Sequence, residues 1–263
     1  YNTDRMRMGA VKIVADGSIQ GYTGYLSEPY HVPYRGDQTY RGYPTLSRED
    51  LFARVSELHG AGYQLAIHGN GDASIQDILD AFEAAQAENP VDDPRMIIIH
   101  SQMAREDQVA RMKDLGATPS FFTAHTWYWG DRHRDIFMGP QRAANISPHG
   151  WALQYGVPFS SHLDTPVVPM EPLQAVWSQV HRITHGGDVL GPEQRIDVMQ
   201  ALRAVTIDAA WQVFMEDEVG SLEPGKSADL VELNGNPLDD PMNMRDLAVQ
   251  RTVIGGVTHY RRQ

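Results

Sequence analysis

Histidine and aspartate residues follow apolar, strand-like runs at three places in the chain. His68 follows Tyr-Gln-Leu-Ala-Ile, His100 follows Met-Ile-Ile-Ile, and Asp164 follows the run Val-Pro-Phe-Ser-Ser-His162-Leu. Imidazole and carboxylate groups are the ligands expected for a catalytic zinc ion that keeps an open position. A lone histidine at a strand end is more often a hydrogen-bonded structural residue. The recurrence of one pattern nevertheless favours a metal site.

Lys12 lies inside another strand-like run, Ala-Val-Lys-Ile-Val-Ala-Asp16. Alternation along a strand places Lys12, Val14 and Asp16 on one face, so Lys12 is expected to face the interior of the fold. In a purely structural interpretation, Lys12 extends to the strand end or pairs with Asp16. In a functional interpretation, its amine is carboxylated by carbon dioxide and bridges two metal ions. The residues alone leave both interpretations open.

An aromatic segment follows a predicted strand at residues 121–131. It could line a substrate pocket, with His125 as a polar contact and Trp127 and Tyr128 beside it, or it could pack a long loop. Both interpretations remain open.

Two further residues could support the metal ligands. His162 lies two residues before Asp164 on the same strand face, where it could hold a ligand by a hydrogen bond. Asp72 ends the sequence Gly-Asn-Gly-Asp directly after His68. We interpret Asp72 mainly as the N-cap of the next helix, with a supporting role at the site.

Short apolar runs alternate with amphipathic stretches along most of the chain. Five buried strands are predicted because the runs are rich in β-branched or aromatic residues and bounded by Gly or Pro. Helical spacing predicts a helix capped by Ser47, a second at 74–87, a third at 105–115 ended by Gly116, and at least one within 192–210. The predicted strands are 11–15, 63–67, 96–99, 117–122 and 157–161. This alternation predicts an α/β fold with a parallel sheet covered by helices.

The C-terminal segment has a different pattern. Residues 220–233 combine turn residues with a strand, and residues 251–260 resemble a hairpin that turns at Gly255-Gly256. We therefore predict two units, a larger one at 1–218 and a small β layer at 219–263.

Composition excludes several classes of function. A formal net charge of -12 disfavours nucleic acid or an anionic membrane as partner, and the absence of cysteine excludes disulfides and a thiol nucleophile. No apolar run approaches the roughly 20 residues of a membrane span, and no signal peptide is visible. Serine-hydrolase, P-loop and dinucleotide-binding motifs do not occur. The expectation is a cytoplasmic enzyme with a small-molecule substrate.

The chain resembles the C-terminal part of the metal-dependent amidohydrolase superfamily, with amidohydrolase family 3 (N-substituted formamide deformylase-like) as the closest group. The resemblance spans nearly all 263 residues. It is carried by Val11–Ser18, Ile67–Asp72, Ile99-His100, Asp164–Pro166, Ala201–Ala210 and Gly220–Val231. The implied fold is a partial TIM (β/α)8 barrel, strands 4–8, followed by a small β-sandwich remnant.

The resemblance implies roles for the strand-end residues. Lys12 would be a bridging, often carboxylated, ligand, and His68 and His100 would bind one of one or two divalent ions, zinc by expectation. Asp164 would bind the same centre and act as general base and proton shuttle. A metal-activated water would then attack an amide-type carbonyl.

The sequence also departs from the family pattern. No His-x-His pair occurs, although the family carries one on strand 1, and Ile99 stands where a Glu commonly precedes the strand-6 His. The chain begins at Tyr1, almost at strand 4, so we expect a truncated chain that forms homo-oligomers or lacks an N-terminal segment. The alternative function is a non-catalytic ligand-binding or regulatory descendant. A cyclic-amide hydrolase or deaminase is a lesser alternative.

Overall fold

Five parallel strands form the main sheet of the protein, in the order β1-β2-β3-β4-β5. The strands are β1 (Val11–Val14), β2 (Leu65–Gly69), β3 (Met96–His100), β4 (Ala117–Phe121) and β5 (Ser160–Ser161). The structure is a computed structural model that describes residues 6–263, so the chain start at Tyr1 lies outside the described residues. The predicted parallel sheet is confirmed, although the fifth strand has only two residues.

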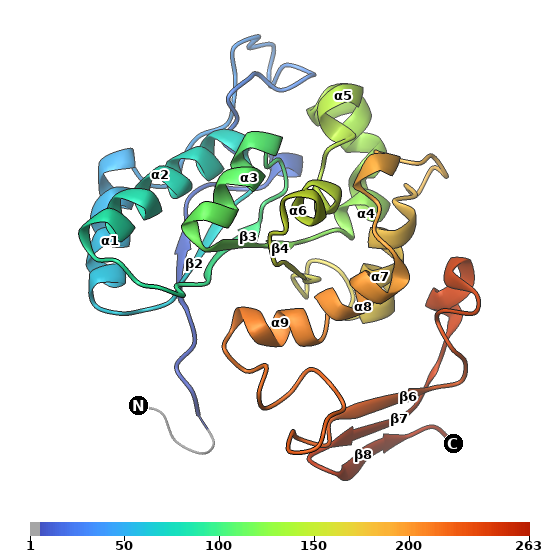
Figure 1. The fold of residues 1–263 in the computed structure, drawn as a ribbon. Helices are drawn as coiled ribbons and strands as arrows, with labels where there is room; N and C mark the ends of the chain where they lie inside the picture. Colours follow the sequence, from blue (N-terminus) through green and yellow to red (C-terminus); the bar gives the residue numbers. More distant parts are fainter. Residues whose placement is uncertain (1–5) are drawn as a thin grey trace.

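Three helices cover one face of this sheet (Figure 1). They are α1 (Arg48–Gly60), α2 (Asp72–Glu88) and α3 (Glu106–Leu115). Ser47 caps α1 by accepting a hydrogen bond from the Asp50 amide at 3.0 Å, as predicted. Gly116 ends α3 with φ +65°, a conformation that favours glycine at this position.

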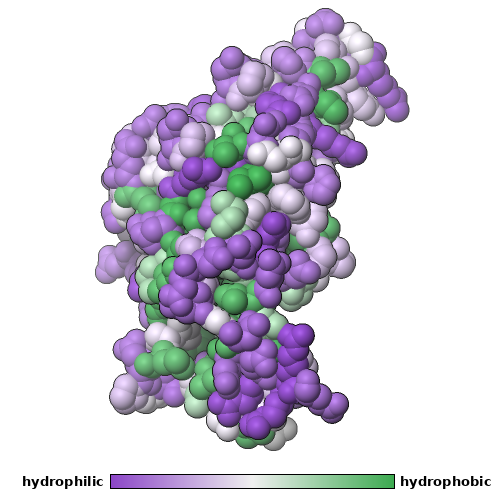
Figure 2. All heavy atoms as spheres, turned by 90° about the vertical axis from the view of Figure 1, so that its right-hand side faces the viewer, coloured by the Kyte–Doolittle hydropathy of each residue, from purple (hydrophilic) through white to green (hydrophobic). Residues whose placement is uncertain are grey.

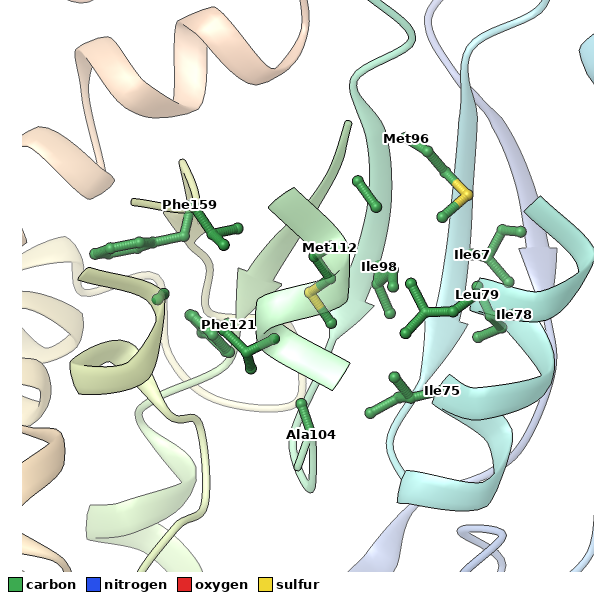
Figure 3. Packing of buried hydrophobic residues seen from close by; sticks show 14 of the residues in the cluster. Ile67, Ile75, Ile78, Leu79, Met96, Ile98, Ala104, Met112, Phe121 and Phe159 are labelled. Atoms are coloured by element: carbon green, nitrogen blue, oxygen red, sulfur yellow. The ribbon is translucent and has the colours of Figure 1, made fainter. Parts of the chain in front are cut away.

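The main core lies between the sheet and these helices. Figure 3 shows Ile75, Ile78 and Leu79 of α2 directed toward the strands, where Ile67 and Ile98 meet them. All five side chains are essentially inaccessible to solvent. Burying an aliphatic side chain of this size stabilises a fold by about 1.5–3 kcal/mol, so this layer holds the strands in position.

The opposite face of β1 is open to solvent. Ile13 is 6% exposed against the helices, whereas Val14 is 45% exposed on the other face. Lys12 shares the face of Val14, as alternation predicts, and is exposed. This face carries Lys12 and His68, two of the candidate ligands named from the sequence.

The remaining helices of the larger unit follow β4 and β5. They are α4 (His125–Arg132), the π-helix η2 (His133–Phe137), α5 (Gly139–Ala143), α6 (His149–Tyr155), α7 (Pro172–His181), α8 (Val198–Ala204) and α9 (Ile207–Gln212), with 3-10 turns η1 (Ile19–Gly21) and η3 (Pro192–Gln194). The aromatic segment that follows β4 is therefore the helix α4 and not a long loop. Within residues 6–263, no helix is long and apolar enough to cross a membrane.

A separate three-stranded antiparallel sheet ends the chain, at the bottom of Figure 1. It contains β6 (Leu230–Leu233), β7 (Val249–Ile254) and β8 (Val257–Arg261), with the 3-10 helix η4 (Pro241–Asp246) between the first two. The predicted turn at Gly255-Gly256 joins β7 to β8, with both residues at positive φ. The boundary placed between residues 218 and 219 stays a prediction.

Apolar side chains of this sheet reach the surface. Val231, Ile254 and Val257 are each more than half exposed. Figure 2 shows hydrophilic side chains over most of one face of the molecule, with groups of hydrophobic side chains between them.

Candidate metal centre

His68 and His100 meet at the ends of the adjacent strands β2 and β3. Nδ1 of His68 lies 3.1 Å from Nε2 of His100. Two neutral imidazole nitrogens this close need either a proton or a metal ion between them, because two facing lone pairs repel. The family resemblance assigned both histidines to one metal ion, and the structure places their rings in direct contact.

The backbone of His100 is what turns its ring toward His68. Ile99 lies beside His68 in the parallel register, so regular alternation would direct the His100 ring to the helix-covered face. His100 instead adopts φ +73°, a left-handed conformation that non-glycine residues rarely take. Asp164 is also left-handed, with φ +52°. Such unfavourable backbone conformations concentrate at functional sites.

The second ring nitrogen of each histidine also has a partner. Nε2 of His68 lies 3.2 Å from the Gly17 carbonyl and 3.5 Å from a carboxylate oxygen of Asp16. Nδ1 of His100 lies 3.1 Å from Nε2 of His162. Histidines that bind metal ions generally donate this second N–H to a carbonyl, carboxylate or similar group. Both rings therefore carry the supporting contacts of ligands.

His68 can exist in two tautomers at this position. With the proton on Nε2, the ring donates to Gly17 and leaves Nδ1 unprotonated toward His100. With the proton on Nδ1, the ring donates to His100 and its Nε2 accepts from the Asn70 amide at 2.9 Å. Metal binding requires the first tautomer, so loading with a metal ion would select it.

A chain of hydrogen bonds continues from His162 into the protein. Nδ1 of His162 lies 3.0 Å from the Ser120 hydroxyl, which lies 2.9 Å from the Ser160 hydroxyl. The Ser160 hydroxyl in turn donates to Oε1 of the Gln212 side chain at 2.6 Å. The series of hydrogen bonds from His100 to Gln212 thus spans β3, β4, β5 and α9, and it fixes the orientation of the His162 ring.

Asp16 is the residue of this site that the sequence analysis undervalued. Its side chain is fully buried, and its carboxylate accepts hydrogen bonds from the amides of Tyr25, Asn70 and Gly71 at 2.8–2.9 Å. Burial raises the pKa of Asp16 to about 7, although the three amides oppose the shift. The carboxylate therefore ties the segment after β1 to the segment that follows His68.

Lys12 and Asp164 add opposite charges to the open face. Partial loss of hydration lowers the pKa of the Lys12 ammonium, and the attraction of Asp164 offsets this only in part. The same two charges act in opposite directions on the pKa of His68, where Lys12 lowers it and Asp164 raises it. Both residues are exposed. Lys12, Asp164 and the histidine pair therefore occupy one electrostatic environment.

The histidines of the site are neutral at physiological pH. Burial lowers the pKa of His68 and His100, and it brings the pKa of His162 to about 3. Neutral imidazole is the form that binds metal ions. Because the rings are neutral, each keeps one unprotonated nitrogen whose lone pair can bind a metal ion.

The facing ring nitrogens of His68 and His100 suit a divalent metal ion, but they form only part of a ligand set. Two nitrogens that bind one tetrahedral zinc ion at about 2.1 Å stand roughly 3.4 Å apart, close to the 3.1 Å between His68 and His100. Over residues 6–263, no group of three or more His, Asp or Glu side chains is arranged to hold a metal ion. The pair therefore needs further ligands, and Lys12 and Asp164 are the candidates on the same face.

The three residues predicted to contact substrate lie in different surroundings. The ring centroid of His125 is 6.5 Å from that of His100, and His125 is 2% exposed. Trp127 packs instead against Trp177 and under the Arg245 guanidinium, on the side of α7 and η4. The structure thus brings His125 to the histidine pair and directs Trp127 elsewhere.

Tyr128 is half-buried in a small cluster with Phe122, Leu163 and Val168. Burial and the Glu171 carboxylate raise the pKa of its phenol. The side chain belongs to the packing between α4 and the segment after β5.

The N-cap prediction for Asp72 is wrong. Gly71 is the N-cap of α2, and a Cβ at Gly71 would lie 1.9 Å from the Tyr25 carbonyl oxygen, so only glycine fits there. Asp72 is the first helical residue. Its carboxylate accepts hydrogen bonds from the Ser27 amide and hydroxyl and pairs with Arg105 at 3.2 Å. Asp72 thus anchors the segment 22–30 to α2 and α3, and the buried carboxylate beside His68 is Asp16.

Comparison with known proteins identifies the family. The profile of the amidohydrolase family matches residues 1–260, so the chain belongs to this family. It is 32% identical to an N-substituted formamide deformylase of Arthrobacter pascens over 98% of this chain and 46% of that protein. It is 27% identical to the putative amidohydrolase YtcJ of Bacillus subtilis (strain 168), over 97% of this chain and 47% of that protein.

Solved structures agree with this assignment. An uncharacterized metal-dependent hydrolase from Pyrococcus horikoshii OT3 is similar with a TM-score of 0.77 and 25% identity, over 99% of this chain and 48% of that chain. One from Pyrococcus furiosus gives a TM-score of 0.71 over 87% of this chain and 44% of that chain, also at 25% identity. The chain spans about half the length of the curated relatives it matches.

Proposed function

We propose that the chain carries the second half of a metal-dependent active centre that hydrolyses amide-type carbon–nitrogen bonds. The observation that carries this proposal is the 3.1 Å contact between Nδ1 of His68 and Nε2 of His100, with the other nitrogen of each ring already engaged. The proposed ligands are Lys12, His68, His100 and Asp164. One or two divalent ions, zinc by preference, would bind there.

We further propose that β1–β5 correspond to strands 4–8 of a (β/α)8 barrel, and that β6–β8 are a remnant of a β-sandwich. The parallel order of five strands and the helices on one face support this proposal. The solvent-exposed face of β1 supports it too. In a closed barrel this face would point inward and be covered by side chains of the other strands.

A bound divalent ion would supply polarisation of a substrate carbonyl and an acidified water. The protein's own side chains would orient the ligands and transfer protons. His68 and His100 would hold their ring nitrogens in place through Gly17 and His162. Asp164 is exposed at the same face and could accept a proton from the attacking water and pass it to the leaving amine.

Lys12 could join this centre as a carbamate. Its lowered pKa increases the fraction of neutral amine, the form whose nitrogen attacks carbon dioxide. An N–C bond then forms, one proton is released, and the product is a carboxylate in place of an ammonium group. That change would convert a repelling cation into a metal ligand.

For the substrate class, the relative from Arthrobacter pascens supports N-substituted formamides. The buried face next to His100 fits such a small uncharged amide, since Phe122 and His125 line it with ring centroids 6.2 and 6.5 Å from His100. A non-catalytic ligand-binding or regulatory role is the competing proposal. It draws support from the fact that His68 and His100 alone are too few ligands for a catalytic zinc ion.

Metal content and turnover test the proposal together. We expect the purified chain to retain about one zinc ion after dialysis, measured by inductively coupled plasma mass spectrometry, and to release formate from N-substituted formamides. His68→Gln and His100→Gln should abolish retention. His181→Gln is the matched control, because the His181 ring lies at the end of α7, where it bonds to the Pro241 carbonyl and packs against Trp177. Equal zinc in all four proteins would refute the proposed ligands, and zinc without turnover would favour the non-catalytic role.

A further inference from the structure

Four polar side chains form a buried cluster beside the histidine pair. Gln20 belongs to η1, Gln102 to the segment after β3, and His125 and His133 begin α4 and η2. Nε2 of Gln20 lies 3.4 Å from Nε2 of His125, and Nε2 of Gln102 lies 3.1 Å from Nε2 of His133. The two imidazole rings are 5.9 Å apart. We call these four residues the Gln-His cluster.

Each member of the Gln-His cluster has one buried polar atom without a hydrogen-bond partner. The atoms are Oε1 of Gln20, Oε1 of Gln102, Nδ1 of His125 and Nδ1 of His133. Gln102, His125 and His133 are at most 2% exposed. Buried polar atoms are nearly always paired, so four unpaired atoms in one cluster indicate a ligand or ordered water.

The unpaired atoms define what kind of ligand would satisfy them. As the amides are oriented, each Gln NH2 donates to a ring Nε2, so both ring protons are on Nδ1. That leaves two N–H donors and two carbonyl acceptors unpaired. Reversing both amides and both tautomers leaves two N–H2 donors and two ring acceptors instead. In either arrangement the cluster requires a group that both donates and accepts.

The cluster also selects against charge. Burial lowers the pKa of His125 and brings the pKa of His133 to about 3, so both rings are neutral at physiological pH. The carboxamides of Gln20 and Gln102 carry no charge. An ionic group would lose its hydration here without a counter-ion, whereas a neutral amide would exchange one set of hydrogen bonds for another.

The position of the cluster connects it to the proposed active centre. Gln102 follows His100 by two residues, and the ring of His125 is 6.5 Å from that of His100. His133 begins a π-helix, a rare conformation that is frequent at functional sites. A small molecule whose reacting carbonyl lay at His68 and His100 could therefore extend a second polar group into the cluster.

We propose that Gln20, Gln102, His125 and His133 form a substrate subsite that binds a neutral amide-type group carried on the substituent of the scissile amide. This proposal rests on the proposed function, because the group is placed relative to the bond to be cleaved. It adds a substrate class: amides whose nitrogen substituent ends in a carboxamide or a similar neutral group.

Three matched probes test the subsite by binding to the chain of residues 1–263 in the presence of a chelator, which prevents turnover. N-formylglycinamide carries a neutral carboxamide, N-isobutylformamide replaces it with an isosteric apolar group, and N-formylglycine replaces it with an anion. We expect the carboxamide to bind at least about tenfold more tightly than either analogue, because a site built for hydrogen bonds rejects groups that cannot make them.

Two variants locate the effect. Gln20→Met and Gln102→Met should each reduce the preference for the carboxamide to less than about threefold. Gln179→Met is the matched control, because Gln179 is also a buried glutamine with an unpaired Oε1, but it lies in α7 and its amide bonds to Ala175. In 15N-histidine spectra, the Nδ1 signals of His125 and His133 should shift with the carboxamide only.

Equal binding of all three probes would overturn the subsite, and so would a preference that survives in both variants. If the chain holds zinc and cleaves formamides without such a preference, the subsite fails and the proposed function stands. If the preference appears in a chain that never holds zinc, the cluster is a binding site and the proposed function fails. A crystal structure with ordered waters on the four atoms that N-formylglycinamide does not displace would also overturn the subsite.

Discussion

Nδ1 of His100 lies 3.1 Å from Nε2 of His162, on the opposite side of the ring from His68. The His100 ring is thus held between two other imidazoles, and the chain through Ser120 and Ser160 fixes the outer one. A donor nitrogen that is held in this way loses little freedom on binding a metal ion. His162 is therefore a positioning residue for His100.

Replacing His162 by Leu should weaken zinc binding about 10- to 100-fold, the range expected when a ligand loses its hydrogen-bond partner. The His100 ring would remain, but its hydrogen bond with His162 would no longer fix which ring nitrogen carries the proton. Competition with a chromogenic chelator measures the affinity. His181→Leu is the control and should leave the affinity unchanged. An unchanged affinity in His162→Leu would show that His162 does not support the ligand.

Acid should destabilise the protein through its buried neutral histidines. Burial lowers the pKa of His133 and of His149 to about 3, from about 6.5 in the unfolded chain. The unfolded state then binds more protons between these values, so stability is complete above about pH 6.5 and falls as the pH decreases toward 3. Each group contributes a slope of up to about 1.4 kcal/mol per pH unit.

Urea unfolding between pH 4.5 and 7 measures this slope. His149→Gln should reduce it by up to about 1.4 kcal/mol per pH unit, because one titrating group is removed. The variant should also be less stable overall, since His149 contacts Thr123, Ser147 and Ser161. His259→Gln, on the exposed strand β8, is the control. A slope that stays the same in His149→Gln would contradict the assigned titration.

Arg182 should be among the most sensitive positions for stability. Its guanidinium is completely buried and donates to the carbonyls of Ala144, Ile146, Ser147 and Leu190. Burial lowers the pKa of Arg182 to about 9. Arg182→Met would leave these carbonyls without donors and should lower the free energy of unfolding by at least about 3 kcal/mol.

The effect of Arg182 should extend to the Gln-His cluster. The Ser147 amide donates to the Gln102 carbonyl at 2.8 Å, so the segment held by Arg182 in turn supports Gln102. Chemical denaturation and the probe preference described above can be measured on the same variant. Arg195→Met is the control, since Arg195 is exposed and its guanidinium donates to the single carbonyl of His181. Equal loss of stability in both variants would contradict the role of Arg182.

The sequence could predict the strands, and that His68 and His100 end neighbouring strands at one edge of the sheet, for a simple physical reason. Strands buried on the helix side are continuous apolar runs, and parallel strands end at the same edge of the sheet, which brings their terminal residues together. The prediction of Ser47 and Gly116 as caps succeeded because capping depends on a few neighbouring residues.

The rest of the site depends on segments without periodicity. Gln20, Gln102 and His133 come from a 3-10 turn, an irregular segment and a π-helix, and no repeating pattern marks any of them. Asp72 failed as an N-cap because α2 begins earlier than predicted, at Asp72 itself, directly after the close approach of Gly71 to Tyr25. Trp127 could not be placed, because its direction depends on how α4 is rotated against α7.

Lys12 provides the sharpest test of whether the centre needs a carbamate. If the neutral amine of Lys12 reacts with carbon dioxide, zinc affinity should rise by about tenfold or more on adding bicarbonate, since a repelling cation becomes a carboxylate ligand. Lys12→Met should remove this dependence and weaken binding. Lys12→Glu supplies a carboxylate directly, so it should bind zinc better than Lys12→Met. Its zinc affinity should not change when bicarbonate is added. Lys113→Met is the control, because Lys113 is exposed on α3 and donates to the Gly156 carbonyl. A bicarbonate effect that persists in Lys12→Met would exclude Lys12 as its site.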